Sequence, residues 1–443
     1  MMDYNSAVAF YHSLERFGIR PGLERIGALC EYLGHPEKQM RYVHVAGTNG
    51  KGTVCTEISN ILRAAGFKTG LYTSPYVLDF RERIQVDNRM IPPEALVSVT
   101  EKVKEAVLAL NAQGVSPTEF EAITAAAFLY FAQAGCRVAV LETGLGGRYD
   151  ATNIIEDPIV SVITSVSMDH MNVLGNTLGE IAYEKCGIIK QRCHSVTTAS
   201  QAPEAARVIR AVAAEKGSFL FEAAPEDLFQ VGETSLDGAD VTYRDTPIHI
   251  PFAGEHQLQN AALSVKACEV IGVNGLDITR KQIKEGIEAS FIPARTEIVC
   301  RDPLILLDGS HNDGSTAALA ALLERFASNK RILAVMGMMR DKDCEKATEH
   351  LCPYFAKVIA VTPSNPRAMP AEEFAGIVRR GGTEAQALED PIRAIDEAFI
   401  QLKDYDMLVV CGSLYLASDV RAHLLKTVKD YKYIGGNSHV HFS

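Results

Sequence analysis

Residues 47–53, with the sequence GTNGKGT, have the composition of a loop that binds phosphate groups. They follow an apolar segment (42–46) predicted to be a strand and lead into an amphipathic segment (54–65) predicted to be a helix. Glycines let backbone N–H groups approach phosphate oxygens, and a helix N-terminus adds positive potential. We expect Lys51 to contact the β- and γ-phosphates of ATP and Thr53 to reach Mg²⁺, although Gly52 interrupts the usual GxxxxGK[ST] pattern. A glycine-rich turn that binds nothing is the less favoured alternative. The predicted phosphate-binding residues are Gly50, Lys51, Gly52 and Thr53.

Two other predicted strands end in side chains that can bind a metal ion. Glu142 follows the apolar segment 138–141, and Asp169 and His170 follow the segment 159–166. Ligands of open α/β sheets bind beyond the carboxyl ends of the strands, which places Glu142 beside the predicted ATP site. Mg²⁺ prefers oxygen ligands and an imidazole favours Mn²⁺ or Zn²⁺, so the role of His170 stays open. Asp169 is an alternative ligand, or a residue that orients His170.

A capping-box pattern, TLGE at residues 177–180, predicts the start of a helix that carries Lys185 in its last turn. Lysine near a helix C-terminus is favoured by the helix dipole. From position alone we therefore expect Lys185 to be a solvated cation.

Composition excludes several classes of protein. The chain has 443 residues, and its 55 acidic and 44 basic side chains give a net charge of −11. An acidic surface repels nucleic acid, and no apolar run approaches the roughly 18 residues of a membrane span. The N-terminal segment lacks the pattern of a signal or transit peptide. Ten cysteines without a CxxC pair favour a reducing cytoplasm over a disulfide or zinc framework.

Short apolar segments alternate with helical patterns along most of the chain, which predicts an α/β fold with helices on both faces of the sheets. Between residues 216 and 252, turn-rich segments predict hairpins, followed by a helix over 257–271. We therefore expect a mostly parallel P-loop-type domain with a small β-rich appendage over 1–294 and a Rossmann-like α/β domain over 295–443. The predicted strands are 42–46, 138–141, 159–166, 304–307, 332–336, 358–361 and 407–410.

Motifs along nearly the whole chain resemble those of the folylpolyglutamate synthase and dihydrofolate synthase family, within the ATP-dependent Mur-type ligases. The phosphate-loop sequence narrows the resemblance to Mur-type ligases, and TSPY (73–76) with GLGGRYDATN (144–153) narrows it to the folate branch. Alanine stands at residue 294, where glycine is common in the family. The other matching motifs are ERFGIRPGL (15–23), ERI (82–84), TEFE (118–121), DHMNVLG (169–175), EKCGIIK (184–190), HQxxN (256–260), PAR (293–295), DGSHN (308–312) and GSLYLAS (412–418).

The resemblance implies a role for each matching residue. Asn260, Arg295 and Asp308 would complete the ATP site, and two Mg²⁺ ions would be held by Ser74, Glu142, His170 and Lys185, the last as a carbamylated lysine. Lys51, Lys185 and His311 are the implied catalytic residues. The implied substrate residues are Thr118, Glu119, Phe120, Glu121, Tyr149, Asp150 and Ala151 for the pterin, and His311 and Ser413 for the incoming glutamate.

The implied reaction is ATP-dependent addition of L-glutamate to a folate, and also to dihydropteroate, through an acyl phosphate. We expect a cytoplasmic monomer that binds neither nucleic acid nor membrane, and a C-terminal domain that moves to exclude water. Two alternatives stay open. One is a related Mur-type ligase acting on a nucleotide-sugar peptide, and the other is a P-loop ATPase that switches partner affinity. The C-terminal segment GGNSHVHFS has no assigned role.

Overall fold

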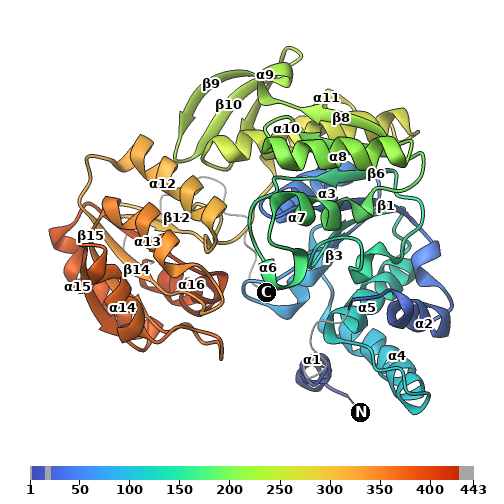
Figure 1. The fold of residues 1–443 in the computed structure, drawn as a ribbon, viewed down its shortest axis with the longest axis horizontal. Coiled ribbons are helices and arrows are strands. Elements are labelled where there is room, and N and C mark those ends of the chain that lie inside the picture. The colour runs from blue at the N-terminus through green and yellow to red at the C-terminus, as the bar shows by residue number, and fades with distance from the viewer. Residues whose placement is uncertain (1, 15–20, 429–443) are drawn as a thin grey trace. The chain divides into compact units, whose positions relative to one another are not determined.

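The protein folds into two compact units, seen here in a computed structural model that describes residues 2–14 and 21–428. Unit 1 comprises residues up to 233 together with 240–251 and 256–291, and unit 2 comprises 234–239, 252–255 and the chain from 292 onward. Figure 1 shows most of unit 2 in orange and red. The predicted boundary near residue 295 stays a prediction. Most of the ERFGIRPGL motif and the C-terminal segment GGNSHVHFS lie outside the described residues.

Unit 1 is built on an eight-stranded sheet with the order β4-β3-β2-β5-β1-β6-β7-β8. Its strands are parallel except at one edge, where β3 pairs antiparallel with both β2 and β4. Strands buried on both faces read as continuous apolar runs, as in Val138–Glu142. The strands are β1 (Arg41–Ala46), β2 (Thr69–Tyr72), β3 (Ile84–Val86), β4 (Arg89–Met90), β5 (Val138–Glu142), β6 (Val160–Ile163), β7 (His194–Thr198) and β8 (Phe219–Ala223).

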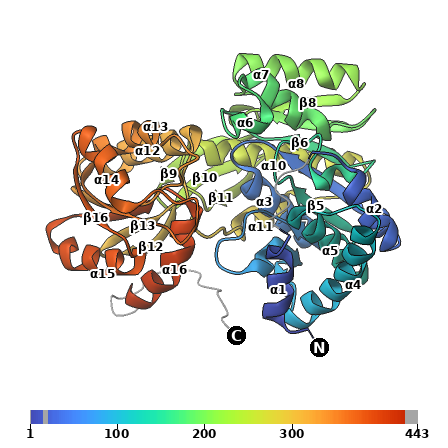
Figure 2. The same cartoon turned by 60° about the horizontal axis from the view of Figure 1, so that its bottom comes forward.

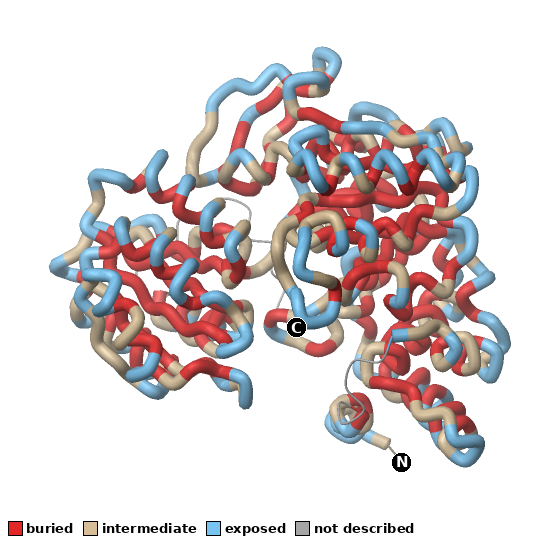
Figure 3. The backbone as a smooth tube through the Cα atoms, in the orientation of Figure 1, coloured by how far each residue is buried: buried red, intermediate tan, exposed pale blue. Residues whose placement is uncertain are grey.

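Helices bury the faces of this sheet. Leu96, Val99 and Phe128 pack in one core cluster with Tyr42, and α4 lies beside α5 in Figure 2. Figure 3 shows the same pattern as buried strands beneath half-exposed helices. The helices are α1 (Tyr4–His12), α2 (Glu24–Tyr32), α3 (Lys51–Ala64), α4 (Pro93–Ala112), α5 (Glu119–Ala134), α6 (Met171–Leu174), α7 (Leu178–Lys185), α8 (Pro203–Glu215), α9 (Pro225–Leu228), α10 (Glu255–Val273) and α11 (Arg280–Glu288).

The turn-rich region forms a three-stranded sheet with the order β11-β10-β9, as the hairpin pattern predicts. Its strands are β9 (Gln230–Ser235), β10 (Gly238–Tyr243) and β11 (Thr246–Ile250). Strand β6 is shorter than the predicted 159–166, because Ser165 leaves the ladder and bridges to Asn49 of the phosphate loop.

Unit 2 has a six-stranded sheet with the order β12-β13-β17-β14-β15-β16, parallel except for the antiparallel pair β12–β13. The predicted α/β class, with a second α/β unit, is therefore confirmed. The strands are β12 (Glu297–Arg301), β13 (Leu304–Leu307), β14 (Ile332–Met336), β15 (Phe355–Val361), β16 (Glu384–Leu388) and β17 (Met407–Cys411). The helices are α12 (Asp313–Ala327), α13 (Cys344–Leu351), α14 (Ala371–Arg380), α15 (Pro391–Gln401) and α16 (Leu414–Val428).

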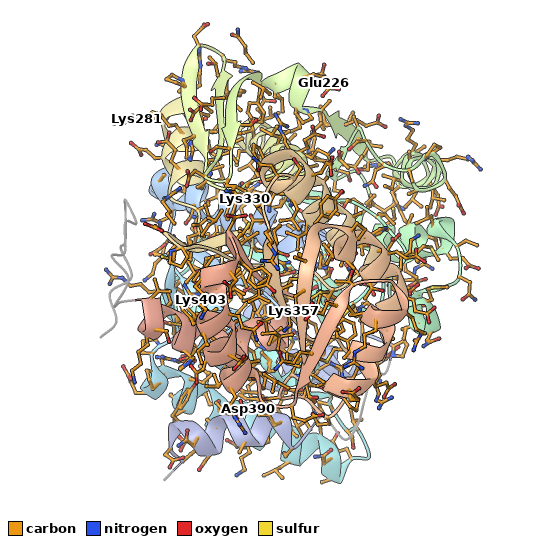
Figure 4. The ribbon with its side chains drawn as sticks, turned by 90° about the vertical axis from the view of Figure 1, so that its left-hand side faces the viewer. Glu226, Lys281, Lys330, Lys357, Asp390 and Lys403 are labelled. Carbon is orange, nitrogen blue, oxygen red and sulfur yellow. The ribbon has the colours of Figure 1, made fainter. Side chains whose placement is uncertain are left out.

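Charges of both signs lie on the outer elements, as Figure 4 shows for Lys281 on α11 and Asp390 before α15. All ten cysteines are buried and free. Within the described ranges, no helix combines the length and apolar character needed to cross a bilayer.

Candidate active site

The phosphate loop, residues 47–53, joins β1 to α3 as predicted, and α3 begins at Lys51. Gly50 precedes the helix with φ of 84°, a left-handed conformation that suits glycine. A β-carbon at this position would overlap the side chain of Asn260, so the glycine also permits close packing against α10. Lys51 Nζ donates to the carbonyl oxygen of Thr48 at 3.2 Å. The loop therefore places backbone N–H groups and one lysine at a helix N-terminus, which is an arrangement suited to an anion.

Loop residues that follow β6 hold the phosphate loop from one side. The backbone N–H of Thr48 donates to the carbonyl oxygen of Ser165 at 2.8 Å, and the Thr164 hydroxyl donates to that of Asn49 at 2.7 Å. Gly47 lies so close to the Thr164 side chain that a β-carbon would overlap it. Neighbouring parallel strands thus fix the loop before any ligand binds.

Glu142 lies at the carboxyl end of β5, opposite Val45 of β1 in the sheet register. Its side chain is buried, and Oε2 accepts a hydrogen bond from the backbone N–H of Ser74 at 3.1 Å. A β-carbon at Gly52 would lie 3.7 Å from the same oxygen. The structure therefore brings together three predicted elements, namely Ser74, Glu142 and the phosphate loop.

Lys185 is buried, with 4% of its surface exposed, and its Nζ donates to the carbonyl oxygen of Gly47 at 2.7 Å. The expectation of a solvated cation is wrong, because the end of α7 packs beneath the phosphate loop. Burial lowers the pKa of Lys185 to about 7, and the positive charge of Lys51 adds to this shift. The amine is thus partly neutral near pH 7, as carbamylation requires.

Two glycines let the end of α7 approach the glycine-rich loop that follows β5. A β-carbon at Gly147 would lie 2.6 Å from the carbonyl oxygen of Lys185, and one at Gly187 would overlap the backbone of Arg148. Asn153 joins the two segments by donating to the carbonyl oxygens of Arg148 at 3.0 Å and Gly187 at 3.1 Å. The close packing of these segments sets the position of Lys185.

His170 lies after β6 with its side chain 44% exposed, and the neighbouring Asp169 is more buried. Asp169 Oδ1 accepts from the backbone N–H of His170 at 2.9 Å, and its negative charge raises the pKa of Lys185 against the effect of burial. Among residues 2–14 and 21–428, no group of three or more His, Cys, Asp or Glu side chains has the arrangement of a metal site. The predicted ligand set contains only two residues of these types, Glu142 and His170.

Several predicted pterin residues shape the backbone of their own loops. Thr118 caps α5, and Glu121 closes the capping box and pairs with Arg25 at 2.9 Å. Asp150 is buried and accepts hydrogen bonds from the backbone N–H groups of Gly144, Leu145 and Thr152. Burial raises the pKa of Asp150, while these hydrogen bonds oppose the shift.

The other predicted pterin residues differ in how far their side chains are exposed. The Phe120 ring packs against Gly144 and lies 5.9 Å from the ring of Tyr72, whereas Tyr149 is 52% exposed. Ala151 is buried, and Glu119 lies 3.1 Å from Nδ1 of His12. Phe120 thus joins the first turn of α5 to the glycine-rich loop.

In unit 2, Arg295 precedes β12, and the other predicted residues lie in the loops that follow β13 and β17. Asp308 is buried and accepts from the backbone N–H groups of Thr296 and Ser310, both at 2.8 Å. His311 Nδ1 lies 2.8 Å from the carbonyl oxygen of Gly309. Ser413 caps the first turn of α16, and the backbone N–H of Gly412 donates to the carbonyl oxygen of Ser310 at 3.1 Å. The loops that carry His311 and Ser413 are therefore in direct contact.

Sequence reasoning missed a buried glutamate behind the phosphate loop. Glu57 of α3 accepts from the Ser264 hydroxyl of α10 at 2.6 Å, and this hydroxyl also lies 3.0 Å from the carbonyl oxygen of Asn260. Burial raises the pKa of Glu57 to about 8. A signal was present, because Glu57 lies three residues after Val54 and four before Ile61, on the apolar face of the predicted helix.

Comparison with known proteins matches most of the chain to two domains of one family. Residues 45–268 match the Mur ligase middle domain, and residues 294–414 match the Mur ligase glutamate ligase domain. The folylpolyglutamate synthase of Lacticaseibacillus casei is 37% identical over 96% of this chain and 99% of its own length. The dihydrofolate synthase/folylpolyglutamate synthase of Bacillus subtilis is also 37% identical, over 95% of this chain and 99% of its own.

Solved structures resemble nearly the whole chain. A Mycobacterium tuberculosis folylpolyglutamate synthase complexed with ADP and AMPPCP superposes with a TM-score of 0.86 and 29% identity, covering 95% of this chain and 99% of its own. Escherichia coli FolC in complex with DHPP and ADP gives a TM-score of 0.84 and 30% identity, covering 98% of this chain and 99% of its own.

Proposed function

Because the chain belongs to the Mur ligase family, in the branch of folylpolyglutamate and dihydrofolate synthases, we propose that it uses ATP to join L-glutamate to the carboxylate of a folate. The observation that carries this proposal is the convergence of three groups at one edge of the unit 1 sheet. Lys185 Nζ lies 2.7 Å from Gly47 of the phosphate loop, and the Glu142 carboxylate lies beside Gly52 of the same loop.

The reaction needs ATP because a carboxylate is a poor electrophile. An oxygen of the substrate carboxylate attacks the γ-phosphorus, the bond to the β–γ bridging oxygen breaks, and ADP leaves. The amine of glutamate then attacks the acyl carbon of the mixed anhydride, phosphate leaves, and the nitrogen loses a proton. Lys51 and the backbone N–H groups of the phosphate loop would stabilise the charge of the transferring phosphoryl group.

The predicted metal-binding residues can hold divalent cations if Lys185 is carbamylated. Glu142 is a buried carboxylate beside the loop, Ser74 offers a hydroxyl, and His170 offers an imidazole. Lys185 can join them only as a carbamate, because an ammonium group cannot bind a cation. Mg²⁺ held there would neutralise phosphate charge. Because His170 offers an imidazole, Mn²⁺ would also suit this set of ligands.

Carbamylation of Lys185 is chemically accessible. The neutral amine attacks CO₂, an N–C bond forms, and the nitrogen loses a proton to give a group with two carboxylate oxygens. With a pKa of about 7, Lys185 presents a larger neutral fraction at neutral pH than an exposed lysine does. Together with Ser74, Glu142 and His170, the carbamate would then hold two divalent ions.

Substitution of Lys185 by alanine tests this part of the proposal. We expect Lys185→Ala to lose most activity and to regain part of it when acetate or formate is added, because a free carboxylate can occupy the vacated position. Lys190→Ala is a matched control, since Lys190 is a nearby, partly buried lysine that donates to the carbonyl oxygen of Asn153. Full activity of Lys185→Ala without added carboxylate would contradict the carbamate role.

The substrate residues follow from the same assignment. We propose that Asn260, Arg295 and Asp308 take part in nucleotide binding, and that His311 and Ser413 bind glutamate. Phe120 and Tyr149 would contact the pterin, while Thr118, Glu121 and Asp150 shape the loops that carry them. Glu119 begins α5, and Ala151 begins the short 3-10 helix that Asp150 caps.

An ADP-release assay tests the proposed function. The purified enzyme is given ATP, Mg²⁺ and glutamate with either tetrahydrofolate or dihydropteroate, and each component is omitted in turn. We expect turnover with both pterin acids and none when glutamate or the pterin is absent. A requirement for a nucleotide-sugar peptide would favour the cell-wall ligase, and ADP release without any acceptor would favour an ATPase switch.

We also propose that the enzyme acts as a cytoplasmic monomer. Light scattering of the purified chain tests the oligomeric state, and a mass of twice the monomer would contradict it.

A further inference from the structure

Arg295 lies between two residues with left-handed backbone conformations. Ala294 has φ of 55° and Thr296 has φ of 48°. This region is uncommon for residues other than glycine, and a β-branched residue such as threonine is a clear outlier there. Such a backbone persists only where surrounding contacts hold it. We call residues 294–297 the arginine loop.

Two buried carboxylates hold the backbone of the arginine loop. Asp308 Oδ2 accepts from the backbone N–H of Thr296 at 2.8 Å, and Glu297 Oε2 accepts from that of Ala294 at 2.9 Å. The carbonyl oxygen of Ala294 accepts from the backbone N–H of Gly309 at 2.8 Å. The residues on both sides of Arg295 are therefore fixed by hydrogen bonds, while its own side chain is half-buried.

Glu297 is in turn held by Arg421 of α16. Nε of Arg421 lies 3.0 and 2.9 Å from the two carboxylate oxygens, and Nη2 lies 2.7 Å from Oε1. The side chains are only 5% and 7% exposed, so water screens this ion pair poorly. A planar guanidinium that makes several hydrogen bonds to one carboxylate fixes its orientation, which a lysine could not do.

We propose that Glu297 and Arg421 are positioning residues that set the backbone of the arginine loop and thereby aim Arg295 at the nucleotide. The chain of contacts runs from Arg421 to the Glu297 carboxylate, and from there to the backbone N–H of Ala294. The inference rests on the proposed function, in which Arg295 contacts ATP. A guanidinium displaced by about 1 Å loses much of its contribution to nucleotide binding, because binding energy depends on preorganised geometry.

Steady-state kinetics of Arg421→Gln test the proposal. We expect the KM for ATP to rise about tenfold while kcat and the KM for glutamate change about twofold or less, since the altered group acts through a nucleotide contact. Arg421→Lys keeps the charge but loses the planar geometry, and we expect it to restore part of the ATP affinity. If Arg421→Gln fails to fold, the same comparison is made between Arg421→Lys and the unaltered enzyme.

A double-mutant cycle separates positioning from simple destabilisation. If Arg421 acts through Arg295, the variant Arg295→Ala/Arg421→Gln has the same KM for ATP as Arg295→Ala alone. Leu424→Ala is the matched control, because Leu424 is fully buried on α16 and its truncation removes apolar packing but no hydrogen bond to the arginine loop. We expect Leu424→Ala to lower the melting temperature and to leave the KM for ATP unchanged.

The possible failures are distinguishable. Independent, additive effects of Arg295→Ala and Arg421→Gln on the KM for ATP would overturn the positioning role, and so would an unchanged KM in Arg421→Gln. An unchanged KM in Arg295→Ala would also overturn it. Absence of ATP-dependent glutamate ligation in the unaltered enzyme would instead remove the proposed function.

Discussion

The phosphate loop and the arginine loop each place a cation after an irregular stretch of backbone, but they stabilise that backbone differently. In the phosphate loop the left-handed residue is Gly50, with φ of 84°. In the arginine loop the left-handed residues are Ala294 and Thr296. Each non-glycine residue in such a region costs on the order of 1–3 kcal/mol, so the second loop depends on contacts outside itself.

The supporting contacts differ in charge as well. Behind the phosphate loop, Glu57 receives one hydrogen bond from Ser264, and burial favours its neutral form. Behind the arginine loop, Glu297 forms a buried ion pair with Arg421. A loop made of glycines therefore has a recognisable sequence, whereas a loop that depends on an ion pair with a residue 124 positions away does not.

Lys51→Ala should give the largest effect, because it removes the charged group of the phosphate loop. We expect ADP release to fall by about a thousandfold or more, since positioned charge supplies most of the catalysis of phosphoryl transfer. The melting temperature should stay unchanged, because the side chain faces the loop rather than the core. Lys68→Ala, at an exposed lysine before β2, is the control. An active Lys51→Ala enzyme would contradict the role of the loop.

Gly50→Ala should weaken nucleotide binding by about ten- to a hundredfold. An added β-carbon both strains the left-handed backbone and overlaps Asn260. Gly66→Ala separates the two causes, because Gly66 at the end of the same helix has a similar φ of 82° but open space around it. Calorimetric titration with ADP measures both variants. Equal losses of affinity would show that the contact with Asn260 has no part in the effect.

Glu57→Gln tests whether Glu57, behind the phosphate loop, is neutral in the folded protein. The test is the pH dependence of stability. The pKa of Glu57 is about 8 in the folded protein against an ordinary value of 4.5, so the folded state holds the proton more tightly. Stability attributable to this group is therefore present below pH 4.5 and is lost as the pH rises toward 8. Glutamine mimics the protonated form and removes this loss.

We expect Glu57→Gln to raise the melting temperature relative to the unaltered protein more at pH 8.5 than at pH 5. Glu101→Gln, at an exposed position on α4, provides the control for a general loss of negative charge. A difference between Glu57→Gln and the unaltered protein that does not vary with pH would argue against a neutral Glu57.

Ala294→Gly should produce the smallest effect. It places in the arginine loop the residue type that the phosphate loop already has at its left-handed position. Glycine relieves the left-handed strain at this position, partly offset by the greater freedom of the unfolded chain. We expect the free energy of unfolding to rise by about 0.5–1 kcal/mol in urea titrations. A loss of stability would mean that the β-carbon of Ala294 makes contacts that outweigh the strain.

Local sequence patterns predicted most of the fold. The runs 42–46, 304–307, 332–336 and 407–410 each became a buried strand, because continuous apolar runs suit parallel sheets. Strand β16 was not predicted, since its sequence EAQAL has no β-branched or aromatic residue and its burial is only partial. An edge strand buries fewer side chains than a central one and therefore leaves a weaker pattern.

The sequence predicted local features of the candidate site that lie within one segment, and it missed features that form where two segments meet. The phosphate loop and the position of Glu142 after β5 were both readable from sequence. Lys185 was expected to be solvated, and only its approach to Gly47, 138 residues away in the chain, buries it. Asp150 matched a substrate motif, yet its carboxylate is engaged by backbone N–H groups of its own loop.

The amino-acid sequence alone determined the strand-loop-helix order around Lys51, the two α/β units and the chemical types of the candidate site residues, because these depend on short-range spacing and side-chain chemistry. Tertiary structure decided which charged side chains are removed from contact with water. Desolvation of Lys185, Glu57 and the Glu297–Arg421 pair arises from packing between distant segments. Since the free energy of a charge depends on everything that surrounds it, no local pattern encodes it.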